Sequence, residues 1–182
     1  MSASEEELFV QQLQNATTKD RAFHQLVAQN KTKLYYHIRS LVLYHEDADD
    51  ILQETFIKAY ENIASFKGNS KLSSWLYRIA TNQSLDFLKQ KSKIQQITLD
   101  EYKQQGIEQL EADSFFNGDE AIVLLHKALD TLPEKQQLVF KMRYFQELDY
   151  KQISSILDTS IGALKASYHH AVKKVEHFLK ED

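Results

Sequence analysis

The residues best suited to chemistry gather around position 50, at the start of the stretch "DADDILQETFIKAYENI". Three aspartates, Asp47, Asp49 and Asp50, follow His45 within a few positions, and Glu54 comes one helical turn later. Side chains four residues apart share a helix face, so Asp50 and Glu54 point the same way if this stretch is helical. Such a cluster fits a metal site, a catalytic pair of carboxylates, or a charged face that binds another protein.

The metal and catalytic interpretations are the least favoured. Their residues would be His45, Asp49, Asp50 and Glu54, and a working site needs further ligands from other helices. No second cluster of acids and histidines falls on an inward face, and the absence of cysteine excludes thiolate sites and disulfides. We expect no metal, no cofactor and no catalytic residue. Asp47 is expected to cap the helix that begins near it.

A second candidate site lies near the C-terminus, where residues 149–174 have the dimensions of a helix-turn-helix. A short helix, a break at 158–159 and a helix starting near Ser160 follow one another. The outer face of the last helix has small residues and then hydrogen-bond donors, which suits a helix entering the major groove. Its central positions are Lys165, Ala166, His169 and His170. Spacing alone leaves open an ordinary helical hairpin with a basic face.

A third candidate is the loop "SFKGNSKLS" with the helix after it. Phe66, Lys67 and Asn82 combine an aromatic ring, a cation and an amide, which together can stack on and hydrogen-bond with unpaired bases. Trp75, in contrast, occupies an apolar helical position and is expected in the core. For Asn82, a solvated surface position is the open alternative.

All three candidates are positioned by helices, because the chain is predicted to be all-α. One proline and four glycines in 182 residues leave few turns, and alternating strand patterns are absent. Apolar residues recur at three- and four-residue steps in several segments. The predicted helices span 5–13, 20–44, 47–63, 73–91, 119–130, 133–145, 149–157 and 160–179.

Charge divides the chain into blocks. Residues 31–93 carry ten basic and seven acidic side chains, whereas residues 94–132 carry two basic and eight acidic ones. The segment 94–118 is also rich in glutamine, so we expect two small helical domains, 1–93 and 119–182, joined by an acidic, partly flexible linker at 94–118. No signal peptide or membrane-spanning stretch is apparent, and a soluble, cytoplasmic protein without membrane insertion is expected.

Four stretches together resemble one family. "DADDILQETFIKAYENI", "FKGNSKLSSWLYRIATNQSLDFLK", "LPEKQQLVFKMRYFQELDYKQISSIL" and "SIGALKASYHHAVKK" occur in the order and spacing found in sigma-70-family transcription initiation factors of the extracytoplasmic-function (ECF) group. The resemblance covers about residues 20–93 and 120–180, which correspond to sigma regions 2 and 4.

The resemblance implies a protein without enzyme activity that binds core RNA polymerase, at the β′ clamp helices and the β flap, and recognises promoter DNA. An anti-sigma factor is a further expected partner. Asp50, Gln53 and Glu54 match the polymerase-contact positions, whereas Phe66, Lys67 and Asn82 match the pocket for a flipped-out base of the −10 element. Lys165, Ala166, His169 and His170 match the −35-reading positions.

Some positions depart from the family pattern. Many relatives have arginine at the positions that Ser167 and His170 occupy in this chain. The absence of arginine there weakens bidentate reading of guanine. The preferred −35 sequence is therefore expected to differ from the common one. The main alternative function is a stand-alone helix-turn-helix regulator, which would bind DNA without polymerase but leaves residues 47–91 without a role.

Overall fold

The computed structural model describes residues 3–95, 101–102, 106–107 and 120–181, and in these residues every regular element is helical. The all-α prediction is confirmed, and each predicted helix occurs close to its expected bounds. The elements are α1 (Ala3–Gln14), α2 (Lys19–Val42), α3 (His45–Asn62), the short 3₁₀ helix η1 (Ile63–Ser65), α4 (Leu72–Gln95), α6 (Glu120–Asp130), α7 (Glu134–Tyr144), α8 (Tyr150–Leu157) and α9 (Ile161–Glu181). No described helix is long and apolar enough to cross a membrane.

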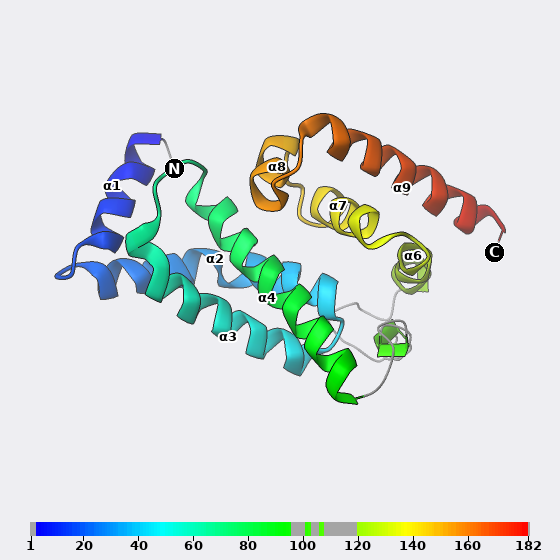
Figure 1. Cartoon of the computed structure of the whole chain (residues 1–182), viewed down its shortest axis with the longest axis horizontal. Helices are drawn as coiled ribbons and strands as arrows, with labels where there is room; N and C mark the ends of the chain where they lie inside the picture. Colours follow the sequence, from blue (N-terminus) through cyan, green and yellow to red (C-terminus); the bar gives the residue numbers. More distant parts are fainter. Residues whose placement is uncertain (1–2, 96–100, 103–105, 108–119, 182) are drawn as a thin grey trace.

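The N-terminal half is a bundle in which α2, α3 and α4 pack against one another, with α1 against α2 at one end (Figure 1). Their apolar stripes meet in a core that excludes water, as the helical periodicity predicts. Its fully buried members include Leu13, Leu26, Leu34, Ile38, Ile63 and Leu76.

The C-terminal half is built around α9, which packs against both α6 and α7. A smaller core of Ala128, Leu129, Leu132, Phe140, Ala171 and Val175 lies between them. Helices α8 and α9 form the predicted helix-turn-helix, and the break between them is made by Asp158 in the left-handed conformation (φ 51°). Ile161, the first residue of α9, is 38% exposed.

The main core extends across both halves. Helix α8 lies against α4, and the main cluster of buried side chains runs from the N-terminal bundle into the C-terminal half (Figure 1). Its members from the C-terminal half are Leu138, Val139, Met142, Leu148, Ile153, Ile156 and Leu164. The described helices therefore form one packed body rather than two separate ones.

Residues of the predicted linker contact the corner between α2 and α3. The Tyr102 side chain is 3% exposed, and its hydroxyl lies within hydrogen-bond distance of two acceptors, the Val42 carbonyl (2.6 Å) and the Asp47 carboxylate (2.7 Å). Lys91 binds the same carboxylate at 2.5 Å. At Gly106, an added Cβ would meet the Leu43 side chain at 3.0 Å, so the chain passes close to this corner. Within the predicted linker, residues 96–100, 103–105 and 108–118 lie outside the described residues.

These contacts correct one expectation. Asp47 lies in the first turn of α3, where a negative charge favours the helix dipole, but α3 has no side-chain cap. The carboxylate is held by Lys91 and Tyr102 instead. Asp47 therefore joins α3 to α4 and to the segment after it.

Candidate protein and nucleic-acid interfaces

The outer face of α3 presents the three predicted protein-contact residues together. Asp50, Gln53 and Glu54 are exposed, because the opposite face of the helix, with Ile51 and Leu52, packs into the bundle. Glu54 forms an exposed ion pair with Lys58, one turn further, at 3.8 Å. Pairs of this kind contribute little to stability, so the carboxylate is available to a partner at small cost.

An exposed apolar residue extends this face. Ile57 is 52% exposed and lies three residues after Glu54, on the same side of α3. The hydrophobic pattern assigned α3 one buried face and did not single out Ile57. A large aliphatic side chain beside carboxylates is typical of the centre of a protein-binding surface with a polar rim.

The histidine before this face has local partners. His45 lies 3.4 Å from Asp49 and accepts or donates a hydrogen bond at 2.6 Å with the Tyr35 hydroxyl. Within the part of the chain that the structure describes, no three acidic or histidine side chains come together as a metal site.

The predicted −10 residues, in the loop after η1 and on α4, differ in their surroundings. Lys67 and, on α4, Asn82 are exposed, whereas Phe66 is only 9% exposed and its ring lies 5.3 Å from that of Trp75. Phe66 thus anchors the loop to α4 in this arrangement. A stacking role for Phe66 stays a prediction, and it would require the ring to leave Trp75.

The outer face of α9 carries the four predicted −35 residues, all exposed: Lys165, Ala166, His169 and His170. The opposite face packs inward through Leu164, Ala171 and Val175. The side chain of Ser160 accepts a hydrogen bond from the Ala163 amide (3.3 Å) and so caps the start of this helix. The four residues thus lie together on the exposed face of α9.

An arginine on α4 links the N-terminal half to α8 of the C-terminal half. Arg78 donates to the carbonyls of Ser155 (2.5 Å) and Ile156 (3.2 Å), in the last turn of α8. Carbonyls at a helix C-terminus carry partial negative charge and attract a guanidinium. Because Asn82 follows Arg78 by one turn, α8 occupies the face of α4 next to a predicted −10 residue.

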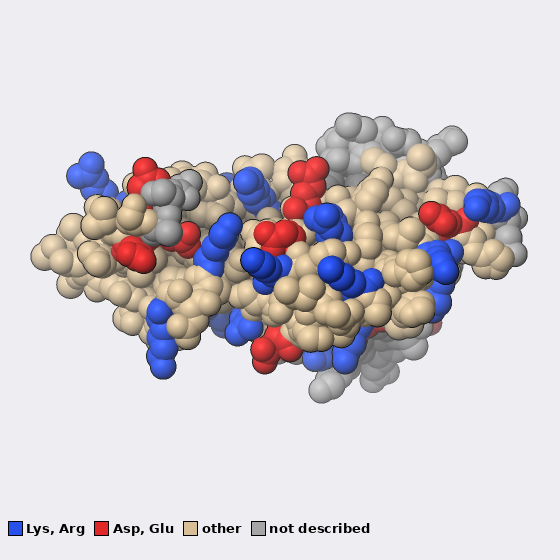
Figure 2. All heavy atoms as spheres, turned by 90° about the horizontal axis from the view of Figure 1, so that it is seen from above, with Lys and Arg blue, Asp and Glu red and all other residues tan. Residues whose placement is uncertain are grey.

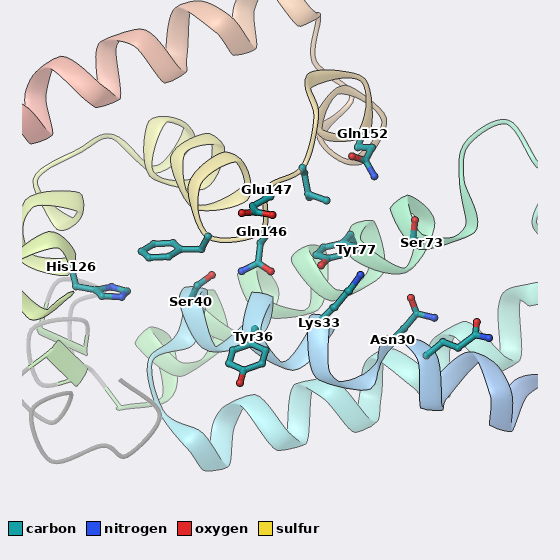
Figure 3. Close-up of a pocket in the computed structure, with 13 residues that line it drawn as sticks. Asn30, Lys33, Tyr36, Ser40, Ser73, Tyr77, His126, Gln146, Glu147 and Gln152 are labelled. Carbon is teal, nitrogen blue, oxygen red and sulfur yellow. The ribbon is translucent and has the colours of Figure 1, made fainter. Parts of the chain in front are cut away.

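A groove of about 570 Å³ lies between the halves (Figure 3). Lys33 and Tyr36 from α2, Tyr77 from α4, His126 from α6 and Glu147 from the α7–α8 loop face it. Burial, followed by the charge of Lys141, lowers the pKa of His126 to about 3, with a smaller effect of Arg39. The junction thus holds a histidine in its neutral form.

Comparison with known proteins decides the family. The sigma-70 region 2 model matches residues 26–94, and the sigma-70 region 4 model matches residues 122–175. The chain belongs to the sigma-70 family, as an ECF sigma factor. A stand-alone helix-turn-helix regulator is therefore not favoured. That alternative leaves the N-terminal bundle without a role, whereas the region 2 match accounts for it.

Relatives share most of the length of this sigma factor. It is 31% identical to the ECF RNA polymerase sigma factor SigW of Bacillus subtilis, over 88% of this chain and 90% of that one. It is 26% identical to the ECF RNA polymerase sigma-E factor of Escherichia coli K12, over 94% and 93%.

Two solved structures share the fold. One is CnrH in complex with the cytosolic domain of CnrY (21% identity, TM-score 0.71, 97% of this chain and 98% of that one). The other is the sigma factor RpoE in complex with the anti-sigma factor NepR from Bartonella quintana (20%, 0.66, 88% and 98%).

Proposed function

We propose that this sigma factor binds core RNA polymerase through the outer face of α3 and directs initiation at specific promoters. The observation that carries the proposal is the exposure of Asp50, Gln53 and Glu54 as one polar face within a matched region 2. Carboxylates beside an exposed isoleucine suit a basic partner surface with an apolar centre. The expected contact is the pair of β′ clamp helices.

Promoter reading is assigned to two further surfaces. The loop 66–71 together with Asn82 would receive a flipped-out base of the −10 element, and Lys67 would contact phosphate. The outer face of α9 would read the −35 element through Lys165 and His169, with His170 beside them. Region 4 would also contact the β flap of the polymerase.

Electrostatics support a role for polymerase in DNA binding. On the face seen in Figure 2, acidic side chains are interspersed with the lysines and arginines, and the net charge is −4. A face on which acidic side chains alternate with the basic ones attracts phosphates weakly. We therefore expect specific DNA binding to require the polymerase complex.

The two halves are expected to separate when promoter DNA is bound. Helix α8 packs against α4 through Arg78, beside Asn82, and the shared core holds α9 close to the N-terminal bundle. The −10 and −35 elements are distinct stretches of DNA, so their two readers must move apart. The proposed units are region 2 at 1–93, a linker at 94–118 and region 4 at 119–182.

An anti-sigma factor is proposed as a second protein partner. RpoE of Bartonella quintana, which shares this fold, was solved with one. A peptide segment of such a partner could bind in the groove between the halves. Polar side chains from α2, α4 and α6 line this groove. We propose no catalytic activity for the chain itself.

In vitro transcription tests the proposal. The purified protein is mixed with bacterial core polymerase and a genomic library, and transcript 5′ ends are sequenced. We expect starts downstream of a shared pair of elements, and an Asn82→Ala variant that binds core normally but opens promoters poorly. Specific binding to duplex DNA without polymerase, together with no binding to any core enzyme, would contradict the assignment.

A further inference from the structure

Helix α1 contacts both ends of the loop between η1 and α4. The matched region 2 begins at residue 26, so this helix lies outside it. Phe9 and Leu13 are buried and fix α1 against the bundle. The helix backbone that carries its polar residues is therefore fixed relative to the bundle.

Gln14 binds the beginning of the loop. Its side-chain amide donates to the carbonyls of Ile63 (3.1 Å) and Phe66 (2.9 Å), across about fifty residues of sequence. The Phe66 amide in turn donates to the Ile63 carbonyl at 3.1 Å. One amide group thus fixes the backbone on which Phe66 and Lys67 are mounted.

Glu6 binds the end of the loop. Its carboxylate accepts a hydrogen bond from the backbone amide of Leu72, the first residue of α4, at 2.5 Å. An acidic side chain at that position satisfies a free amide of the helix and favours its dipole. The cap is supplied by a distant helix instead of by the preceding residue.

Between these two points the loop is shaped by backbone geometry. Gly68 adopts φ +71°, a conformation that other residues rarely take. A groove of about 430 Å³ separates α1 from the loop, with Glu7 and Gln11 on the helix side and Lys67 and Lys71 on the loop side. The loop is therefore tied at its ends, while its middle faces open space.

We infer that Glu6 and Gln14 are positioning residues for recognition of the −10 element. The inference rests on the proposed function, because it assigns −10 recognition to the loop. A loop that reads a base must hold its backbone in one conformation, and otherwise part of the binding energy is lost to ordering. Glu6 and Gln14 supply that order without contacting DNA themselves.

Hydrogen exchange of the free protein tests the structural part. In Gln14→Glu, which keeps the size of the side chain but replaces its donors with a carboxylate, the Phe66 amide should exchange about two- to tenfold faster. In Glu6→Ala, the Leu72 amide should likewise exchange about two- to tenfold faster. Glu7→Ala and Gln11→Ala, which line the same groove, are matched controls and should leave both rates unchanged. Unchanged rates in Gln14→Glu and Glu6→Ala overturn the inference.

Transcription from a promoter pool randomised over the −10 element tests the functional part. We expect Gln14→Glu and Glu6→Ala to flatten the base preference about two- to tenfold, with core binding within about twofold of wild type. Glu6→Gln, which keeps an acceptor oxygen, should restore the preference. An unaltered preference in the two variants, or equal loss in the controls, overturns the inference. If the wild-type protein directs no initiation, the proposed function fails, and the exchange rates still decide whether α1 holds the loop.

Discussion

Single residues of the acidic cluster have different surroundings and hence different roles. Asp47 is half-buried and held by Lys91 and Tyr102, so it contributes to the structure. Asp50 and Glu54 point outward on α3. The sequence pattern placed these carboxylates on one helix but could not separate them, because the partners of Asp47 lie more than forty residues away.

Charge reversal on α3 is expected to weaken polymerase binding. In Asp50→Lys and Glu54→Lys, the new cation would face a basic partner surface and weaken binding to core polymerase by about tenfold or more. The fold should persist, since both positions are exposed. Affinity is measured with labelled protein, and Glu7→Lys, the same charge change on α1, serves as the control. Wild-type affinity in Asp50→Lys and Glu54→Lys would show that this face does not dock.

A single lysine of α9 is expected to change the salt dependence of promoter binding. Lys165 is exposed on the outer face, and its ammonium lies 5.9 Å from the Tyr150 ring centre. If it contacts a phosphate, Lys165→Ala should lower the affinity of the holoenzyme for promoter DNA. The slope of log affinity against log salt should fall by about one. An unchanged affinity together with an unchanged slope would assign promoter reading to other residues.

Among the elements, α8 has the most complete local signals. Asp149 accepts from the Gln152 amide (2.8 Å), and the Gln152 side chain accepts from the Asp149 amide (2.9 Å), which makes a capping box. The helix is only eight residues long. Short helices are unstable alone, so the cap and the packing against α4 together hold it.

Removal of this cap is expected to cost stability. Asp149→Ala should lower the free energy of unfolding by about 1 kcal/mol, and Asp149→Asn, which keeps the acceptor, by much less. Urea titrations followed by circular dichroism measure both. Equal losses in the two variants would mean that the charge of Asp149, rather than its hydrogen bond, stabilises α8.

The helices themselves could be predicted because their signals are local. Apolar spacing marked α3, and Pro133 and Ser160 marked the starts of α7 and α9 within a residue or two. The packing of α8 against α4 and the burial of Tyr102 depend on partners distant in sequence. Nothing in the sequence around Arg78 indicated that the end of α8 would accept its hydrogen bonds.

Across the whole molecule, two buried histidines make stability depend on pH. Burial, followed by the charge of Lys141, lowers the pKa of His37 to about 3, as at His126. The unfolded forms take up a proton below about pH 6.5, where the folded forms remain neutral. The contribution of the neutral histidines to the free energy of unfolding is fully present above about pH 6.5. It is lost as the pH falls towards 3.

The free energy of unfolding should therefore fall by about 1.4 kcal/mol per pH unit for each histidine between about pH 6 and pH 4. Urea titrations across this range measure the slope. His126→Phe, which keeps an aromatic ring against Phe145, should reduce the slope by one histidine's share. The same slope in wild type and His126→Phe would show that His126 is not the group that titrates.

The shared core makes the free protein behave as one cooperative unit. Side chains such as Met142 and Ile153 are completely buried within a cluster that belongs mainly to the N-terminal bundle. Cleavage of the backbone between Gln95 and Glu120 would remove the covalent link but not this contact. The two fragments should therefore migrate together in gel filtration and melt in a single transition, so a protease scan that detects only the nick would miss the complex.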